Sequence, residues 1–455
     1  MGGGDWTQFR HSPLGGASEN PGVFTTAEAA NLTPLWSIAG HPADDTLGQY
    51  VYAQALITAD TIYFTTASAA AKVVALNANT KEVRWSRAFP GDINPGCGTY
   101  GPPPIRPGIW ASPALAGGVL YIASPDGRIY ALSPADGSTI WSVQVADPTP
   151  AGRGQFIESS PAVSIALDKL YVGIASTDGC AEIAGRVASV DLTTHAVQYV
   201  DLDPAGHFGS AVWTSISIDE AAGAVYATSG NGKHPEPLAS TPHTQSFLKL
   251  SAADLHVLDG WQNPCSLTDC DFGASPTLFN AGDGTPLVAA TSKDGYLYVL
   301  NRAGLSAGYR WRYQLGLVDP AHATEGANGT AGWGTLSTPT FAHGTLYAAG
   351  GHTPQGEVGS VVAFEPGTGA VKWKHVTPGY VLTSMPAVGD VLLVESSSPD
   401  NSQSWLEVLD QATGTQLKIF NSPMATYAAP SVGHGMIIWS DAVGHVTALV
   451  VPHYR

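Results

Sequence analysis

The chain has 455 residues, a formal net charge of −17 at pH 7, 52 glycines, 33 prolines and only 13% charged residues. The acidic balance makes nucleic acid and anionic membrane surfaces poor partners. The sequence has no run of about 18 apolar residues, so we expect no membrane span. Abundant glycine and proline supply turns between many short strands, which is typical of an all-β fold.

The start of the chain has no regular pattern. We expect residues 5–31 to be irregular and to wrap the outside of the fold, whereas residues 32–37 (LTPLWS) read as a single strand with no local partner. The first residues, MGGGDW, show neither a cationic region nor an apolar core, so no signal peptide is visible. We expect that an export signal has been removed.

Residues 112–141 show the unit that the rest of the chain repeats. Four runs rich in β-branched and aromatic residues are separated by the turns GG, PDG and PADG. This pattern predicts a four-stranded antiparallel meander. Because one such meander cannot bury both of its apolar faces alone, it must stack on copies of itself.

Eight copies can be aligned on a start of small residues. In five of them a tyrosine follows this start, eight residues later or, with insertions, ten residues later. They start at Ala55, Pro113, Pro161, Ile216, Pro276, Pro339, Pro386 and Pro430. The eighth copy lacks its fourth strand, and residues 32–37 would supply it and close the ring. We therefore predict one all-β domain, an eight-bladed β-propeller of four-stranded antiparallel blades. Residues 1–31 would be irregular, 32–37 the closing strand, and 50–452 the blades.

The four cysteines indicate an oxidising compartment. Cys265 and Cys270 lie five residues apart in one loop and could bridge, and Cys97 and Cys180 fall in neighbouring repeats and could also bridge. An even cysteine count in a loop-rich β-protein favours a periplasmic or secreted location. No CxxC or CxxCH occurs, which excludes a zinc ribbon and a c-type haem.

Function is expected in the loops that depart from the repeat, because the repeat itself is scaffold. The main departures are residues 89–110, ASTDGCAEIAG in the third unit, GSAVW and SGN in the fourth, NPCSLTDCDFGASP before the fifth, and residues 319–333 before the sixth.

These loops resemble the pyrroloquinoline quinone (PQQ)-dependent alcohol dehydrogenases, an eight-bladed quinoprotein family that holds its cofactor and a calcium ion at the mouth of the channel. In CGTYGPPPIRPG, Arg106 stands at the family's quinone-contacting arginine. In GCAE, Glu182 stands at a calcium ligand, and in GSAVW, Trp213 stands at the indole beneath the quinone.

The later loops extend the resemblance. In SGN, Asn231 matches a calcium-binding asparagine, and in CDF, Asp271 matches the catalytic aspartate that also approaches calcium, with Asp269 close by. In SKDG, Lys293 matches a basic residue that contacts the quinone oxygens. Less specifically, Ser159 in ESSP matches a cofactor-contacting hydroxyl.

The resemblance implies oxidation of an alcohol or polyol hydroxyl with PQQ and Ca2+ as cofactors. Asp271 would act as general base, Lys293 would stabilise negative charge, and Ca2+ would act as a Lewis acid. The substrate would be a small-molecule or polymeric alcohol, and the run DCDFGASP favours the polyvinyl-alcohol-oxidising branch. Electrons would leave to an external acceptor, since the sequence has no haem motif.

Other interpretations remain open. Taken singly, Trp213 could be a core residue, and Asn231 and Lys293 could be turn residues; only their joint order favours a cofactor site. A single Cys97 replaces the family's adjacent cysteine pair, and the insertion around Glu182 is short. A non-catalytic propeller that binds protein or glycan as an envelope scaffold is therefore the alternative. A sugar-cleaving propeller would need two facing carboxylates, which the sequence does not identify.

Overall fold

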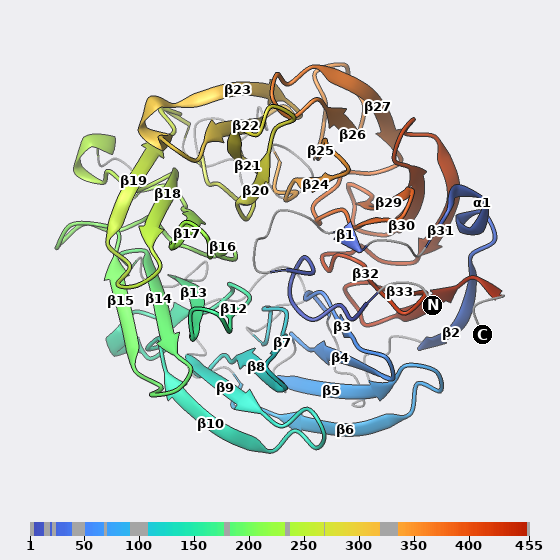
Figure 1. Cartoon of the computed structure of the whole chain (residues 1–455), viewed down its shortest axis with the longest axis horizontal. Coiled ribbons are helices and arrows are strands. Elements are labelled where there is room, and N and C mark those ends of the chain that lie inside the picture. Colours follow the sequence, from blue (N-terminus) through green and yellow to red (C-terminus); the bar gives the residue numbers. More distant parts are fainter. Residues whose placement is uncertain are drawn as a thin grey trace.

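The computed structural model describes residues 4–12, 19–20, 24–38, 51–67, 71–91, 108–176, 183–232, 237–267, 269–318 and 335–452. Within these ranges the strands form eight sheets arranged in a ring (Figure 1). The predicted all-β, eight-bladed propeller is confirmed. No helix of the described residues is long and apolar enough to cross a membrane.

The first four blades follow one another along the chain, each from its inner to its outer strand. Blade 1 contains β3 (Leu56–Ile57), β4 (Thr61–Thr65), β5 (Lys72–Asn77) and β6 (Val83–Ala88). Blade 2 contains β7 (Ala114–Ala116), β8 (Val119–Ala123), β9 (Arg128–Leu132) and β10 (Thr139–Gln144). Blade 3 contains β12 (Ala162–Ser164), β13 (Lys169–Ser176), β14 (Arg186–Asp191) and β15 (Val197–Asp201), with β11 (Gln155–Phe156) added to β13. Blade 4 contains β16 (Ser217–Asp219), β17 (Ala224–Thr228), β18 (Ser246–Ser251) and β19 (Val257–Gln262).

The other four blades follow the same order. Blade 5 contains β20 (Thr277–Asn280), β21 (Pro286–Thr291), β22 (Tyr296–Asn301) and β23 (Tyr309–Gln314). Blade 6 contains β24 (Thr340–Ala342), β25 (Thr345–Gly351), β26 (Gly359–Phe364) and β27 (Val371–Thr377). Blade 7 contains β28 (Ala387–Val388), β29 (Val391–Ser397), β30 (Ser404–Asp410) and β31 (Gln416–Ser422), and β1 (Glu19–Asn20) pairs parallel with β28. Blade 8 contains β32 (Ser431–Gly433), β33 (Met436–Ser440) and β34 (Val446–Val450), with β2 (Thr33–Ile38) outermost. The helical pieces are α1 (Thr26–Ala29) and the 3-10 turns η1 (Pro150–Gly152), η2 (Leu238–Ser240) and η3 (Leu305–Ala307).

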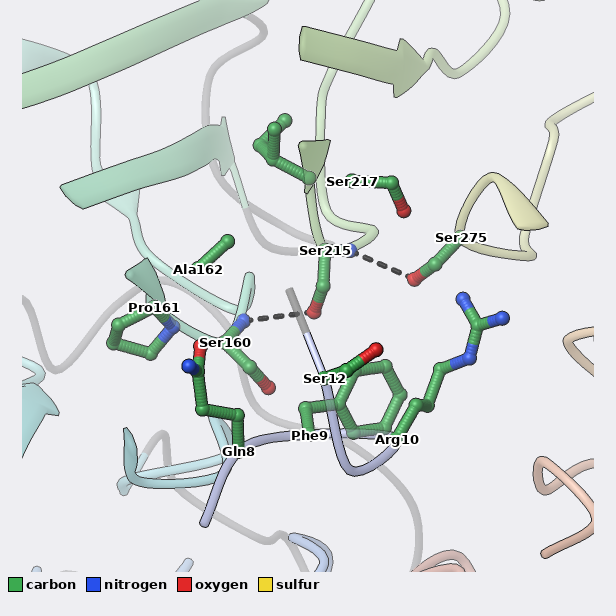
Figure 2. Close-up of a pocket in the computed structure, with 11 residues that line it drawn as sticks. Gln8, Phe9, Arg10, Ser12, Ser160, Pro161, Ala162, Ser215, Ser217 and Ser275 are labelled. Atoms are coloured by element: carbon green, nitrogen blue, oxygen red, sulfur yellow. Dashed lines mark hydrogen bonds between the residues drawn. The ribbon is translucent and has the colours of Figure 1, made fainter. Parts of the chain in front are cut away.

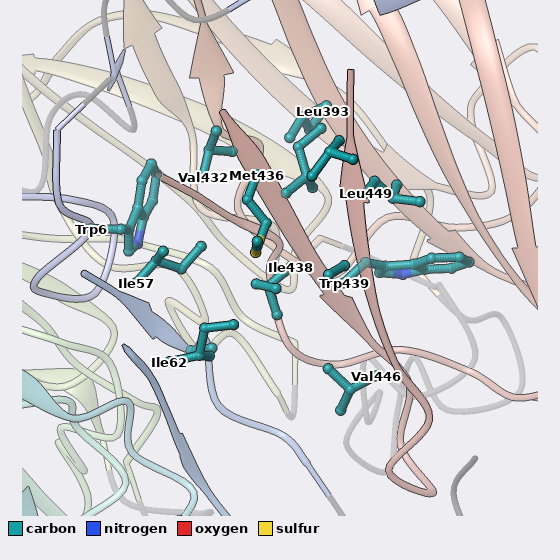
Figure 3. Close-up of a cluster of buried hydrophobic side chains, with 14 of the residues drawn as sticks. Trp6, Ile57, Ile62, Leu393, Val432, Met436, Ile438, Trp439, Val446 and Leu449 are labelled. Atoms are coloured by element: carbon teal, nitrogen blue, oxygen red, sulfur yellow. The ribbon is translucent and has the colours of Figure 1, made fainter. Parts of the chain in front are cut away.

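The ring closes as the sequence predicts. Strand β2 pairs antiparallel with β34, with Thr33 opposite Val450 and Ile38 opposite Val446. At the joint, Ser431 Oγ donates a hydrogen bond to the Ala55 carbonyl at 2.6 Å. A buried apolar cluster shared by blades 7, 8 and 1 and by the start of the chain surrounds this joint (Figure 3).

The aligned tyrosines occupy one repeated register. The residue after the start of each unit faces the tyrosine of the second strand, and the pairs are Leu56 with Tyr63, Ala114 with Tyr121, Ala162 with Tyr171, Ser217 with Tyr226 and Thr340 with Tyr347. These tyrosine side chains are buried. The alignment made on the sequence therefore corresponds to one structural position in the blade.

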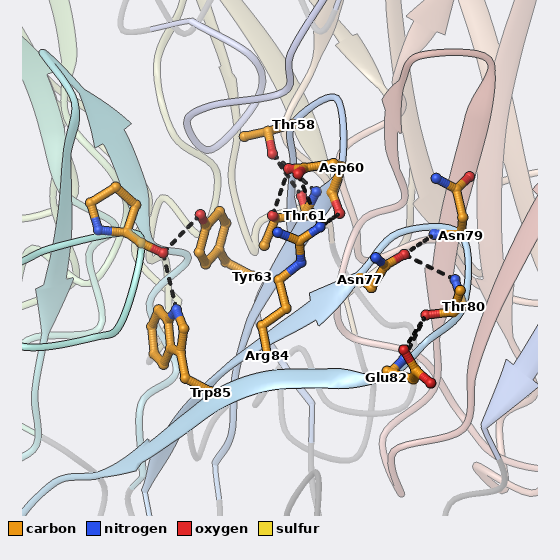
Figure 4. A network of polar contacts seen from close by, with 11 residues as sticks. Thr58, Asp60, Thr61, Tyr63, Asn77, Asn79, Thr80, Glu82, Arg84 and Trp85 are labelled. Atoms are coloured by element: carbon orange, nitrogen blue, oxygen red, sulfur yellow. Dashed lines mark hydrogen bonds and ion pairs between the residues drawn. The ribbon is translucent and has the colours of Figure 1, made fainter.

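Outer-strand tryptophans link several blades to the next one in the ring. Trp85 Nε1 and the Tyr63 hydroxyl both donate to the Pro134 carbonyl of blade 2, at 3.0 and 3.2 Å (Figure 4). Trp373 Nε1 donates in the same way to Gln411 in blade 7, at 3.0 Å. A buried indole that keeps its N–H paired contributes apolar area without an unsatisfied donor.

A glycine lies against the face of both of these indoles. Gly414 has φ +72°, and a Cβ there would approach the Trp373 ring to 2.6 Å; Gly137 has the same relation to Trp85, at 2.7 Å. Both the backbone conformation and the close approach require glycine at these turns. The glycines of these turns therefore allow both the turn conformation and the packing of one blade against the next.

The start of the chain does not wrap the outside of the ring, so that expectation is wrong for residues 4–12. Trp6 forms a β-bridge with Ile57, the Thr7 carbonyl accepts from Leu115 N at 2.7 Å, and Gln8 exchanges two hydrogen bonds with Val163. Residues 4–12 therefore cross the central channel, where they pair with inner-strand backbone groups that would otherwise face an open channel.

Among the described residues of this segment, the stretch around α1 lies at the outside. Figure 1 shows α1 beside β31 at the rim of the ring, and Lys418 Nζ donates to the Ala30 carbonyl there at 3.4 Å.

One acid is buried among the inner strands of blades 7 and 8. Glu395 on β29 is fully buried, and its Oε2 accepts from Thr426 Oγ1 at 3.2 Å. Burial raises the pKa of this carboxyl well above its usual value, and the nearby Asp441 carboxylate adds to the rise. Glu395 is therefore a neutral acid over a wide pH range.

Replacing the glycine under a docked indole tests the link between blades. Gly414→Ala should lose about 1 kcal/mol for the left-handed backbone and about 1–3 kcal/mol more for the overlap with Trp373. Gly284→Ala is the matched control, since Gly284 has φ +82° but open space around its Cβ position. Urea unfolding of both variants measures the difference, and equal losses would contradict the proposed packing role.

The buried acid predicts a pH dependence of stability. A carboxyl whose pKa is higher in the folded than in the unfolded state stabilises the fold at low pH and loses this contribution as pH rises. From about pH 4.5 upward, the free energy of unfolding should therefore fall more in the wild type than in Glu395→Gln. The exposed Glu82→Gln serves as control and should follow the wild type; parallel curves for all three proteins would disprove the assignment.

Candidate functional site

Blades 4 and 5 supply four of the predicted site residues, each in an irregular segment next to a strand. Trp213 precedes β16 and Asn231 follows β17; Asp271 precedes β20 and Lys293 follows β21. In an antiparallel hairpin, the start of the first strand and the end of the second lie at the same edge. All four residues therefore reach the same mouth of the channel.

Asp271 is at the centre of a polar cluster. Its Oδ1 accepts the backbone N–H of Asn231 at 2.6 Å and its Oδ2 accepts from Lys293 Nζ at 2.8 Å. Lys293 Nζ also donates to Asp269 Oδ2 at 3.0 Å. A Cβ at Gly230 would lie 2.9 Å from Asp271 Oδ1, so glycine leaves room for the carboxylate.

The cluster holds more negative than positive charge when both carboxyls are ionised. Burial, followed by the repulsion of the Asp271 carboxylate, raises the pKa of Asp269 to about 7, although Lys293 opposes this rise. Burial by itself would lower the pKa of the Lys293 ammonium, but the two carboxylates outweigh it and raise the pKa. Lys293 is therefore a permanent cation, whereas Asp269 can exchange a proton near neutral pH.

A disulfide fixes the loop that carries both aspartates. Cys265 and Cys270 are bonded, which confirms one of the two bridges that the sequence allowed. Gln245 Nε2 donates to the Cys265 carbonyl at 2.8 Å and ties the loop to blade 4. Because Asp269 and Asp271 flank Cys270, the bridge limits the movement of both carboxylates.

Trp213 lies next to the ammonium of the cluster. Lys293 Nζ is 5.6 Å from the centroid of the indole, within the range of a cation–π contact. A Cβ at Gly273 would approach Trp213 Cη2 to 2.8 Å, so glycine permits the close packing of this ring. The indole thus joins the polar cluster to the channel.

A cavity of about 170 Å³ opens beside Trp213. Its other aromatic lining residues are Tyr52, Trp110, Tyr427 and Phe9. The ring of Tyr52 contacts those of Trp110 and Tyr427 edge-on, with centroids 6.1 and 5.1 Å apart. Aromatic walls of this kind suit a flat, largely apolar ligand.

Sequence reasoning found Trp213 but missed the other aromatic residues of the cavity, although a signal for most of them was present. Tyr52, Trp110, Trp213 and Tyr427 each stand three residues before the aligned start of their repeat. All four side chains line the same cavity. Phe9 had no such signal, because it belongs to the irregular start of the chain.

Ser159 lies in the third blade next to the cavity wall. Its side chain is fully buried, and its hydroxyl has no hydrogen-bond partner among the described residues. The neighbouring residues Glu158 and Ser160 line the cavity. A buried hydroxyl without a partner is unusual in a folded protein.

The remaining predicted residues are not placed. Arg106, Glu182 and both Cys97 and Cys180 lie outside the described residues, as does the loop 319–333. Within the part of the chain that the structure describes, no cluster of three or more His, Cys, Asp or Glu side chains is arranged to hold a metal. The structure thus brings Asn231 and Asp271 into contact, and the third expected metal ligand, Glu182, lies outside the described residues.

Comparison with known proteins finds similarity both in sequence and in fold. Residues 25–250 match a family model described as outer membrane protein assembly factor BamB. A polyvinylalcohol dehydrogenase of Sphingopyxis sp. (strain 113P3) is 25% identical over 309 residues, which are 58% of this chain and 44% of that protein. The chain thus spans less than half of the length of this relative.

Solved structures share the fold at low identity. A europium-containing methanol dehydrogenase has a TM-score of 0.75 at 16% identity, covering 97% of this chain and 90% of that one. A quinohemoprotein alcohol dehydrogenase from Comamonas testosteroni has a TM-score of 0.71 at 16% identity, covering 98% and 80%. BamB from Moraxella catarrhalis has a TM-score of 0.56 at 15% identity, covering 93% and 99%.

The repeat, the closed ring and these matches confirm the resemblance predicted from the sequence. The chain is an eight-bladed propeller similar in fold to solved methanol and alcohol dehydrogenases.

Proposed function

We propose that the protein is a PQQ- and Ca2+-dependent dehydrogenase that oxidises alcohol or polyol hydroxyl groups and passes the electrons to an external acceptor. One observation carries the proposal: two neighbouring blades bring Asn231, Asp271 and Lys293 into hydrogen-bond contact beside the Trp213 indole. Independent turn residues would have no reason to meet in this way.

The residues present fit the two cofactors. Trp213 borders a cavity with aromatic walls, which suits a flat tricyclic quinone. The carboxylate of Asp271 is a hard oxygen donor, and the side-chain carbonyl of Asn231 would be a second, which suits Ca2+. The unpaired hydroxyl of Ser159 could donate to a cofactor oxygen. Arg106 and Glu182 would complete the proposed set.

Each residue of the cluster has a distinct role in the proposed reaction. When bound, PQQ accepts the electrons and Ca2+ polarises its quinone. Asp271 removes the proton of the substrate hydroxyl as general base. Lys293 orients the Asp271 carboxylate and stabilises negative charge on an oxygen within its reach. Asp269, whose pKa is raised to about 7, can take up the proton that Asp271 removes.

The substrate would be a small-molecule or polymeric alcohol. Similarity to a polyvinylalcohol dehydrogenase supports the polymeric class. The Cys265–Cys270 disulfide supports a periplasmic or secreted location, where such bonds persist.

The family match to an outer membrane assembly factor favours one alternative, a non-catalytic scaffold that binds protein or glycan. A scaffold would not need a buried Asp–Lys–Asp cluster. Burying three charged groups costs free energy of folding, and a catalytic role gives a reason for keeping them. The two functions are separated by a variant that alters the cluster without changing its shape.

Asp271→Asn is that variant. With PQQ and Ca2+ added, the wild type should reduce a dye in the presence of an alcohol, and the variant should be about 100-fold slower or worse because the general base is lost. PQQ binding should change only a few-fold, because the amide keeps the shape of the side chain and retains one oxygen that can face Ca2+. Asp283→Asn, at an exposed turn, is the control and should keep full activity.

If the wild type binds no PQQ and turns over no member of a panel of simple and polymeric alcohols, the enzyme proposal is wrong. If Asp271→Asn retains full turnover, the general base is another residue.

Replacing the indole tests the cofactor platform separately. Trp213→Ala should weaken PQQ binding about 5-fold, which corresponds to the ~1 kcal/mol that a well-placed aromatic contact contributes beyond its area. Titration calorimetry with PQQ in the presence of Ca2+ measures this directly. Trp141→Ala, on the outer strand of blade 2, should leave the affinity unchanged; an equal loss in both variants would indicate general destabilisation instead.

A further inference from the structure

The start of the chain places a guanidinium in the middle of the ring. Arg10 is 1% exposed. Its Nη1 donates to the Pro276 carbonyl at 3.2 Å, and its Nη2 donates to Thr277 Oγ1 at 2.5 Å and to the Pro339 carbonyl at 3.2 Å. Its Nε has no partner among the described residues. The side chain is thus held by two blades but is not fully satisfied.

None of these partners carries a negative charge. In the described ranges of the chain, Arg10 forms no ion pair, and burial alone lowers its pKa to about 9. A guanidinium nevertheless keeps its proton at neutral pH. Because a buried charge is costly unless it is paired, a compensating anion is expected near Arg10.

A small cavity lies beside this side chain. Figure 2 shows Arg10 and four serines, Ser12, Ser160, Ser215 and Ser275, around it. Its volume is about 10 Å³, roughly the space for a single species of about the size of a water molecule. The cavity is therefore too small for sulfate, phosphate or an organic acid.

The serines around the cavity are placed to donate hydrogen bonds. Ser160 Oγ accepts from Ser112 N at 3.0 Å, Ser215 Oγ accepts from Ser160 N at 3.0 Å, and Ser275 Oγ accepts from Ser215 N at 2.9 Å. Each of these bonds uses one lone pair of the hydroxyl oxygen and leaves its O–H group to donate. Ser217 differs, since its hydroxyl already donates to the Pro276 carbonyl at 2.6 Å.

The only amide side chain at the cavity has both of its ends engaged. Gln8 Nε2 donates to the Val163 carbonyl at 3.3 Å and Gln8 Oε1 accepts from Val163 N at 3.1 Å, so the amide is held by the Val163 backbone. Three hydroxyl donors and a guanidinium thus surround a space of atomic size.

We propose that this cavity is a binding site for a monatomic monovalent anion, with chloride as its occupant. A water molecule would also accept from the serine hydroxyls, but it would leave the charge of Arg10 uncompensated. The anion would hold the N-terminal segment across the channel and link it to blades 3, 4 and 5. This proposal does not depend on the proposed dehydrogenase function.

Thermal unfolding of the full chain tests the proposal. After exchange into sodium gluconate, the unfolding midpoint should rise in a saturable manner when chloride or bromide replaces gluconate at constant ionic strength. Arg10→Met should abolish this halide-specific rise. Arg84→Met is the control, because Arg84 forms an exposed ion pair with Asp60 and should leave the rise intact. Equal midpoints in all three salts for the wild type would overturn the proposal.

A second measurement uses the unaltered protein, in case Arg10→Met does not fold. Crystals grown in sodium bromide should show one anomalous peak within hydrogen-bond distance of the hydroxyls of Ser160, Ser215 and Ser275. A water molecule without anomalous signal at this position, or a carboxylate of the chain filling it, would show that the site does not bind an anion.

Discussion

Closure of the ring is the constraint on which the rest of the structure depends. Each blade has two apolar faces, so no blade is stable without a neighbour on both sides. The pairing of β2 with β34 gives the last blade its outer strand, and Ser431 then joins blade 8 to blade 1 through the Ala55 carbonyl. Between the other blades, indoles on the outside and hydroxyls at the channel make the corresponding links, for example Trp373 to Gln411 and Ser215 to Ser275.

The closed ring explains why the candidate site lies where it does. Inner hairpins of all blades point the same way, so equivalent loops meet at one mouth of the channel. The polar cluster needs two blades at a fixed distance, since Asn231 comes from blade 4 and Asp271 and Lys293 come from blade 5. Local features then refine the position: Gly230 leaves space for the carboxylate and the disulfide holds its loop. The scaffold and the chemistry are thus separate in the sequence but joined in space.

The features that the sequence could predict are those with a local pattern or a repeat. The aligned starts and tyrosines predicted the register of the blades, and the unpaired strand at residues 32–37 predicted the closure. Asp271 and Lys293 were found through motifs. The second hydrogen bond of Lys293, to Asp269, could be seen only in the structure. The path of residues 4–12 could not be predicted, because its partners lie far along the chain. Arg10 contacts Pro276 and Thr277, and no spacing rule connects such residues.

The N-terminal segment and the candidate site also share one wall. Phe9 lines the same cavity as Trp213, and its neighbour Arg10 contacts the inner strand of blade 5, the blade that carries Asp271. A ligand in the cavity would therefore contact a segment that is held by hydrogen bonds and not by a sheet of its own. Contacts between this segment and a bound ligand would stabilise both of them. By linkage, the ligand would favour the ordered segment, and the ordered segment would favour ligand binding. The irregular start of the chain, which looks least structured in the sequence, thus forms part of the channel on which the proposed chemistry depends.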